Sequence, residues 1–283
     1  MIATRYPLDA QRSFHLAGVA TGDFVSPSIL ALHGWLDNAA SFQPLFALWN
    51  DEKAVAVDFA GHGLSDHRAA GAWYYFTEYV ADIVQLLETQ DWHSIHLLGH
   101  SMGGFVAQVV AALCPERISR LTLIEAFGLW ISPSGQFVEH LKKALIDRRN
   151  LVAKRPPVYS DKERLVRLRA EKSNLNTDLA RLIVERNLVS VEQGYTWTVD
   201  PRVRLASPFR FTAEQAVDML KHIECPVDLI LGDQGTPDIV RGLKIWEAYL
   251  PQLQVHRLQG GHHVHMEQPQ QVAQIVSGIT EKS

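Results

Sequence analysis

The sequence predicts an α/β fold, with a mostly parallel central sheet, helices on both faces and an inserted helical lid. The first observation is that short apolar runs alternate with helical patterns over about the first 125 residues, as in parallel βαβ units. The second is that the same alternation resumes after Pro208. The charged stretch between these two parts shows helical patterns without clear strands. We therefore expect one core domain, formed by residues 1–128 and 209–283, and a helical lid at residues 129–208.

Apolar periodicity gives the predicted elements in order. Short apolar runs predict strands at residues 13–19, 29–32, 54–58, 95–98, 121–125, 227–231 and 254–258. Apolar residues at spacings of three and four predict helices at residues 39–49, 77–89, 102–113, 213–223 and 237–250, and a last helix from Pro269. Helices on both faces bury the strands between them, which agrees with the apolar character of these runs.

Composition and charge exclude several classes of protein. Apolar residues make up 47% and charged residues 20% of the 283 residues, as in ordinary globular chains and unlike disordered or collagenous ones. The net charge of −4 argues against nucleic acid or an anionic membrane as the main partner. The longest apolar stretch is far too short to span a bilayer, and the first residues show no signal-peptide pattern. We expect a cytoplasmic monomer or homodimer that acts on a small molecule and keeps Cys114 and Cys225 as reduced thiols.

The predicted lid has a charge character of its own. Residues 139–187 hold 13 Lys and Arg against 7 Asp and Glu, while the rest of the chain holds 14 against 24. A basic lid would raise the local concentration of anionic substrates. Solvated helix faces, with Glu163 and Arg167 paired at a spacing of four, explain the same pattern and are the simpler interpretation.

The strongest functional motif is Gly99-His100-Ser101-Met102-Gly103-Gly104, between the predicted strand at 95–98 and the predicted helix at 102–113. This G-x-S-x-G pattern is typical of a nucleophile elbow, a sharp turn that exposes a serine Oγ at the end of a strand. The flanking glycines leave room for such a turn. The start of the next helix directs backbone N–H groups toward an oxyanion beside Ser101, so we expect Met102 N–H to be one donor.

A second oxyanion donor is expected in the loop after the strand at 29–32. Gly34 lets the backbone turn there, and we assign the donor to Trp35 N–H, with Leu36 as the alternative if the register is shifted by one residue. We interpret His33 as structural, with its ring hydrogen-bonded within the loop. The glycine turn at 58–65 is interpreted as architecture in the same way.

Activation of a serine requires a general base, for which histidine is the usual residue. Among the 13 histidines, His262 is the best placed, because it follows two glycines in a loop after the last predicted strand. His263 and His265 remain alternatives. We predict no metal site from these three histidines, because no Asp, Glu or Cys at ligand spacing accompanies them.

Four segments carry a resemblance to a known family. Residues 33–42, 58–65, 99–104 and 260–269 read HGWLDNAASF, DFAGHGLS, GHSMGG and GGHHVHMEQP. Over nearly the whole chain, this pattern resembles the α/β-hydrolase superfamily, and within it the serine hydrolase-like proteins. The resemblance implies the α/β-hydrolase fold and a catalytic triad, but no particular substrate.

The sequence departs from the family at the third member of the triad. Family members usually carry the acid at the position that Gly235 occupies here, and glycine cannot orient an imidazole. Some α/β-hydrolases, including one branch of the haloalkane dehalogenases, carry it at the end of the strand before the lid, where this chain has Glu125. Burial of an unpaired carboxylate there would be costly, so we predict Glu125 as the acid. Asp233 and Asp238 are the alternatives, although Asp238 also fits the first turn of the next helix.

These residues predict two-step acyl transfer without cofactor or metal. Ser101 attacks a carbonyl, His262 moves protons and water hydrolyses the acyl-enzyme. The expected substrate is a carboxylic ester or thioester with a small to medium acyl group, in a pocket that includes Leu36, Phe127 and Trp130. A lactonase, an amidase or a cofactor-free perhydrolase would use the same triad, and a non-catalytic ligand-binding homologue is an alternative of another class.

Overall fold

The computed structural model of the chain describes all residues except 10, 12, 132–134, 152–156, 208 and 279–283. Its central sheet has the strand order β1-β2-β4-β3-β5-β6-β9-β10. The bounds are Ile2–Pro7 for β1, His15–Ala20 for β2, Ile29–Leu32 for β3, Ala54–Val57 for β4, Ile95–His100 for β5, Ile118–Ile124 for β6, Val227–Gly232 for β9 and Leu253–Leu258 for β10. Only the two pairings of β2 are antiparallel among these strands. The predicted α/β class with a mostly parallel sheet is confirmed.

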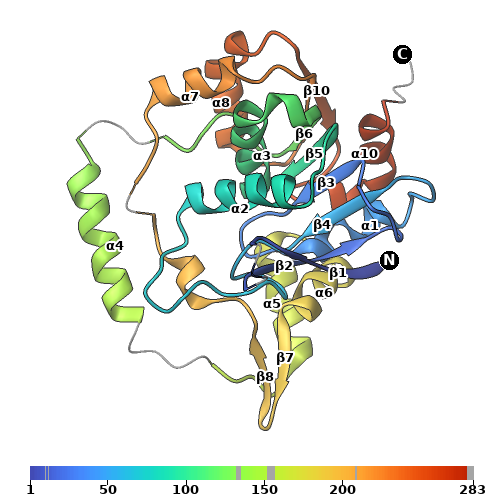
Figure 1. Cartoon of the computed structure of the whole chain (residues 1–283). Helices are drawn as coiled ribbons and strands as arrows, with labels where there is room; N and C mark the ends of the chain where they lie inside the picture. Colours follow the sequence, from blue (N-terminus) through green and yellow to red (C-terminus); the bar gives the residue numbers. More distant parts are fainter. Residues whose placement is uncertain (10, 12, 132–134, 152–156, 208, 279–283) are drawn as a thin grey trace.

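Helices cover both faces of this sheet (Figure 1). One face packs against α2 (Phe76–Thr89), α3 (Met102–Leu113), α7 (Ala213–Lys221) and α8 (Pro237–Trp246). The other packs against α1 (Gln43–Phe46), α9 (Val264–Glu267) and α10 (Pro269–Val276). Strand β3 shows why the runs are apolar throughout: Leu30 and Leu32 join the first core, while Ile29 and Ala31 join the second.

Two predicted helices differ from the structure, and one strand was not predicted. This strand is β1, whose residues are exposed or half-buried and which pairs with β2 at the edge of the sheet. The helix predicted at 39–49 is a 3₁₀ turn at Ala39–Phe42 followed by the short α1, because Pro44 lacks a backbone N–H and favours the first turn of a new helix. The helix predicted at 237–250 ends as an α-helix at Trp246 and continues as a 3₁₀ turn at Glu247–Tyr249.

Residues 129–208, called the insert below, contain α4 (Phe137–Leu151), α5 (Lys162–Ser173) and α6 (Thr177–Arg186). They also contain an antiparallel hairpin of β7 (Leu188–Val191) and β8 (Gly194–Trp197), so the expectation of an insert without strands is wrong. Val, Thr, Tyr and Trp favour these two short strands. Gly194 has φ 137°, which closes the turn, and a Cβ there would overlap the Tyr159 carbonyl.

Buried polar contacts attach α6 and the residue after it to the core. Arg186 pairs with the fully buried Asp58 at 2.8 Å. The side chain of Asn38 donates to the Ile183 carbonyl at 2.8 Å, and Gly63 N–H donates to the side chain of Asn187 at 3.1 Å. The glycine turn at 58–65 is therefore architectural, as predicted, and it also anchors the insert.

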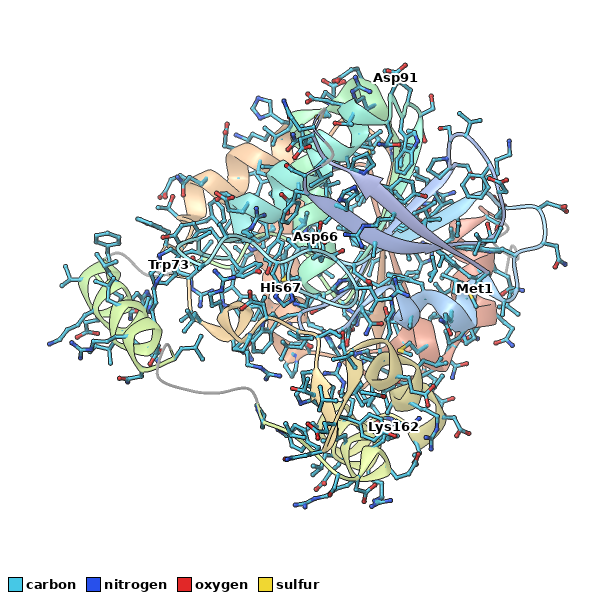
Figure 2. The ribbon with its side chains drawn as sticks, turned by 60° about the horizontal axis from the view of Figure 1, so that its bottom comes forward. Met1, Asp66, His67, Trp73, Asp91 and Lys162 are labelled. Carbon is cyan, nitrogen blue, oxygen red and sulfur yellow. The ribbon has the colours of Figure 1, made fainter. Side chains whose placement is uncertain are left out.

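Helix α4 and Arg202, two further parts of the insert, make separate contacts with the core. Helix α4 lies beside Trp73 (Figure 2), with the Arg148 guanidinium 4.3 Å from the centre of the Trp73 ring. Arg202 makes several bonds to Asp200, the shortest of 2.6 Å, and also donates to backbone carbonyls of the core. The predicted pair of Glu163 and Arg167 is wrong, because Glu163 pairs with Arg181 and Arg167 lies near Asp161.

Two further observations concern the chain as a whole. Cys114 and Cys225 are both buried and unpaired, as expected. Within the described ranges, no helix has both the length and the apolar character that crossing a membrane requires.

Several buried histidines stay neutral in the folded state. Burial is the main cause and lowers the pKa of His33, His96 and His100 to about 4 and that of His62 to about 3, from an ordinary value of 6.5. The unfolded chain therefore binds protons at a higher pH than the folded chain does. By linkage, the stability that these groups contribute is complete above pH 6.5 and is lost as the pH falls toward 4.

We predict that the free energy of unfolding decreases steeply between pH 6.5 and about 4, with a slope of up to about 1.4 kcal/mol per pH unit for each such histidine. Urea unfolding followed by circular dichroism at several pH values measures this slope. His96→Gln removes one group and should flatten the profile, whereas His222→Gln, at an exposed position, should not. A profile that is level down to pH 5 would contradict the prediction.

Candidate active site

Ser101 occupies the sharp turn between β5 and α3. Its backbone has φ 50° and ψ −119°, a conformation that is strained for a residue with a side chain, and its N–H bonds the Ile124 carbonyl of the neighbouring strand at 2.9 Å. A Cβ at Gly103 would overlap the Leu32 carbonyl, and one at Gly99 would overlap the backbone of Gly104. The glycines therefore let the helix start close to the strands, which gives the geometry that the G-x-S-x-G motif predicts.

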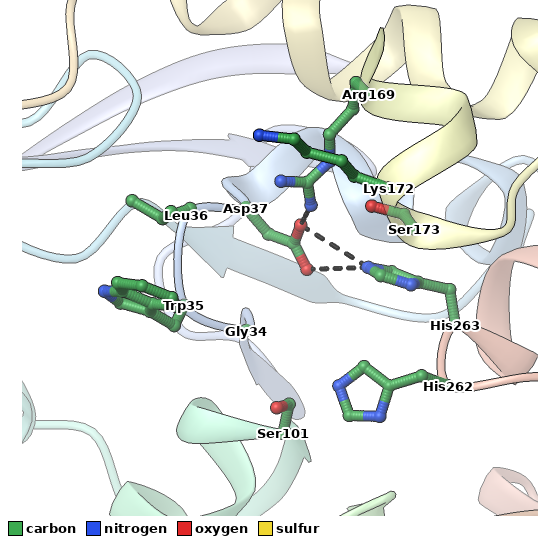
Figure 3. A pocket seen from close by; sticks show the side chains of 10 residues that line it. All are labelled: Gly34, Trp35, Leu36, Asp37, Ser101, Arg169, Lys172, Ser173, His262 and His263. Atoms are coloured by element: carbon green, nitrogen blue, oxygen red, sulfur yellow. Dashed lines mark hydrogen bonds and ion pairs between the residues drawn. The ribbon is translucent and has the colours of Figure 1, made fainter. Parts of the chain in front are cut away.

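A cavity of about 310 Å³ lies above Ser101 (Figure 3). Ser101 and His262 form one side of it, and side chains of α5 form the opposite side. The lining residues are Gly34, Trp35, Leu36, Asp37, Ser101, Arg169, Lys172, Ser173, His262 and His263. Residues from the loop after β3, the turn after β5, helix α5 and the loop after β10 thus meet at the carboxyl edge of the parallel strands, where ligands bind in open α/β sheets.

His262 contacts the predicted acid through Nδ1. This atom lies 3.4 Å from Glu125 Oε2 and 2.9 Å from the hydroxyl of Thr236. Glu125 is almost fully buried and also accepts backbone N–H groups from Gly232 at 2.9 Å and Thr236 at 2.7 Å. Burial raises the pKa of the Glu125 carboxyl, but the hydrogen bonds with His262, Thr236 and Gly232 outweigh it and leave the pKa below its usual value.

Gly235 faces the carboxylate of Glu125. A Cβ at position 235 would overlap Oε1 of Glu125, so the space of a side chain at 235 is filled by the carboxylate that enters from β6. Glu125 has φ 51°, in the left-handed region that disfavours residues with a Cβ. The strained turn directs its side chain across the end of β9 toward the loop of His262. The absence of an acid at position 235 and the presence of a carboxylate at position 125 are therefore two parts of the same arrangement.

The two alternative acids have other partners. Asp233 accepts the Gly260 backbone N–H at 2.9 Å from an exposed position. Asp238 lies in the first turn of α8, after Thr236 and Pro237, and pairs with Arg241. Neither makes a hydrogen bond or an ion pair with His262 among the described residues.

The predicted oxyanion loop borders the cavity. Met102 is the first residue of α3, and Trp35 and Leu36 both line the cavity. Leu36 has φ 62°, which shows a tight turn directly after Trp35. The Trp35 indole is half exposed and donates to the Val203 carbonyl of the insert at 2.9 Å.

Two residues expected in the pocket lie elsewhere. Phe127 is 3% exposed and belongs to the first core, and Trp130 packs edge-to-face on Phe105 with ring centres 5.9 Å apart. Neither lines the cavity, which leaves Leu36 as the member of that set that does. Phe127 and Trp130 follow β6, on the side of the chain that packs on α3 and α8.

His33 has the structural position that the sequence suggests. Its Nε2 accepts the Phe59 backbone N–H at 2.9 Å, so Nδ1 carries the proton and donates to the Gly34 carbonyl at 2.7 Å. The neutral ring thereby connects the loop after β3 to the loop after β4.

His100 and Asp37 make contacts that sequence reasoning missed. His100 Nε2 lies 2.9 Å from the His262 carbonyl, to which it donates, so the residue before Ser101 holds the backbone of the candidate base. Asp37 lies 3.2 Å from His263 Nε2 and also pairs with Arg169 of α5. The motifs contain His100, Asp37 and His263, but spacing along the chain does not show that they touch.

Asp37, His100 and His263 also form the metal-like cluster found among the described residues, with one ligand atom of each within 4.8 Å of the others. Asp37 is far from these histidines along the chain, so the sequence alone does not connect them. The guanidinium of Arg169 already neutralises Asp37, and its fixed charge would repel a cation there. The residues fit a polar network better than a metal site. His265 is fully buried against His100 and does not line the cavity.

Comparisons with known proteins agree with this geometry. The profile of the alpha/beta hydrolase family matches residues 29–275. A serine hydrolase-like protein of Danio rerio is 31% identical over 93% of this chain and 84% of its own length, and serine hydrolase-like protein 2 of Homo sapiens is 31% identical over 94% and 90%. The crystal structure of a hypothetical protein from Pseudomonas aeruginosa PAO1 is 36% identical, with a TM-score of 0.87 over 99% of this chain and 98% of that one. The chain belongs to the alpha/beta hydrolase family, and the resemblance to serine hydrolase-like proteins is confirmed.

Proposed function

We propose that the protein is a serine hydrolase that cleaves carboxylic esters or thioesters with small to medium acyl groups. The observation that carries this proposal is the position of Ser101 on a strained turn beside His262, whose Nδ1 is held near the buried Glu125. Membership of the alpha/beta hydrolase family supports hydrolytic chemistry in general. The triad, the oxyanion donors and the substrate are our assignments.

In the proposed reaction, Ser101 Oγ attacks the carbonyl carbon while His262 Nε2 accepts the Oγ proton. His262 then gives that proton to the leaving alcohol or thiol, and an acyl-enzyme forms. Water then attacks the acyl carbon while His262 accepts its proton. Transfer of this proton to Ser101 Oγ releases the acid. Glu125 keeps the His262 proton on Nδ1 and stabilises the imidazolium that forms in both steps.

The oxyanion is assigned to two backbone donors. Met102 N–H begins α3, so the partial positive charge of the helix start supports it. Trp35 N–H lies in the loop that borders the same cavity. The volume of about 310 Å³ is at the small end of the range for ligand sites, which favours small to medium acyl groups.

We predict that a fluorophosphonate labels the wild-type protein once, at Ser101, and that labelling is much slower in Glu125→Gln. An amide at 125 removes the charge that stabilises the imidazolium, and the corresponding change in a serine protease costs on the order of 10⁴ in turnover. Intact mass and peptide mapping measure the rate and the position. Ser101→Ala should not be labelled at all. A folded wild-type protein that resists labelling would refute an activated serine.

The mutual fit of Glu125 and Gly235 gives a second prediction. Gly235→Asp alone overfills the site and Glu125→Gly alone leaves it without an acid, so both should lose most of the labelling rate. The double variant Glu125→Gly/Gly235→Asp places a carboxylate where other family members have one and should recover at least about tenfold over either single variant. Labelling rates of the four proteins, compared at equal folded fraction, form the test. If the losses of labelling rate in the two single variants simply add in the double variant, the two positions are independent.

A further inference from the structure

We infer that the substrate of this site carries an anionic group, a carboxylate or a phosphate, that Lys172 and Arg169 bind opposite Ser101. The inference rests on the proposed function, because it names the substrate class of the same cavity. Its basis is the charge of the wall that α5 presents to the cavity (Figure 3).

The α5 wall contains two cations and a hydroxyl. Arg169, Lys172 and Ser173 are at spacings that place them near one another at the end of α5, and all three line the cavity. Lys172 has no hydrogen bond or ion pair with any described residue. The Nε of Arg169 is buried and also lacks a partner among those residues. A guanidinium has five N–H donors, so Arg169 keeps further donors besides the one that contacts Asp37.

Asp37, the carboxylate among the described residues that line the cavity, cancels only part of this charge. Asp37 is 1% exposed and is engaged by Arg169 and by His263 at 3.2 Å. Burial raises the pKa of the Asp37 carboxyl, but His263 and Arg169 outweigh it and hold the pKa well below its usual value, so Asp37 stays ionised and pairs internally with Arg169. The positive charge of Lys172 remains for a ligand.

The walls of the cavity predict a ligand with two chemically different parts. Trp35 and Leu36 offer apolar contact beside Ser101, and on the far side Lys172 offers charge and Arg169 offers N–H groups. A molecule that fits both has a reactive carbonyl near an apolar segment and an anion at some distance from it. The surplus of positive charge over residues 139–187 would also attract such a molecule from solution.

The test compares substrates with and without an anionic group at one end. The first pair is the pentanoyl and the glutaryl monoester of 4-nitrophenol, in which a methyl group is exchanged for a carboxylate. The second pair is pentanoyl coenzyme A and the pentanoyl thioester of N-acetylcysteamine, which tests an anion on the leaving group. We expect wild-type kcat/KM to favour the charged member of at least one pair, and Lys172→Met to reduce that preference by about tenfold or more.

The matched control is Lys162→Met, the same substitution on the same helix. Lys162 pairs with Glu185 at an exposed position and does not line the cavity, so the preference should not change. A change confined to the glutaryl pair assigns the anion to the acyl group, and a change confined to the coenzyme A pair assigns it to the leaving group. Equal use of charged and neutral members by wild type and Lys172→Met would overturn the inference while leaving the hydrolase proposal intact.

A binding measurement separates the two proposals if no ester is cleaved. Titration calorimetry with glutarate and with the uncharged methyl pentanoate on the Ser101→Ala protein requires no catalysis. Glutarate binding that is lost with Lys172→Met would support the anionic site even where Ser101 fails to label. Absence of glutarate binding together with absence of charged-substrate preference would refute it.

Discussion

The buried carboxylate of Glu125 is the interaction on which the candidate site depends. It leaves the end of β6 and accepts backbone N–H groups at the end of β9 and at the start of α8, and it lies near the ring of His262 in the loop after β10. Three segments that are far apart in the sequence therefore meet at this one carboxylate. Because an ionised group inside the protein requires such partners, the loops and the carboxylate determine one another's positions.

A second buried charge, Asp37, performs a comparable role. It joins the loop after β3 to the loop after β10 through His263 and to the insert through Arg169. Asp58 and Arg186 make another such connection. The insert is thus attached to the core by ion pairs that water reaches poorly, and α5 brings its cations to the cavity as part of that attachment. The contacts that fix the position of the insert therefore also bring the positive charge of α5 to the cavity.

Local patterns predicted the parts of the molecule that depend on local physics. The central strands are recognisable because both of their faces are buried, and Ser101 is recognisable because an elbow requires glycines within a few residues. Glu125 could be proposed because a carboxylate at the end of an apolar strand needs a partner. By contrast, Thr236, His100 and Asp37 gain their roles from contacts across the fold that spacing cannot show. The edge strand β1 and the hairpin β7–β8 were missed because they bury little apolar surface.

The overlap between positions 125 and 235 also has an evolutionary meaning. Because the carboxylate of Glu125 fills the side-chain space of position 235, the location of the proposed acid depends on two positions rather than one. A lineage that moves the acid must change both, and either single change passes through a site that is overfilled or has no acid. A glycine in the usual acid position of a related sequence is therefore no sign of lost activity until the end of the strand before the insert has been inspected.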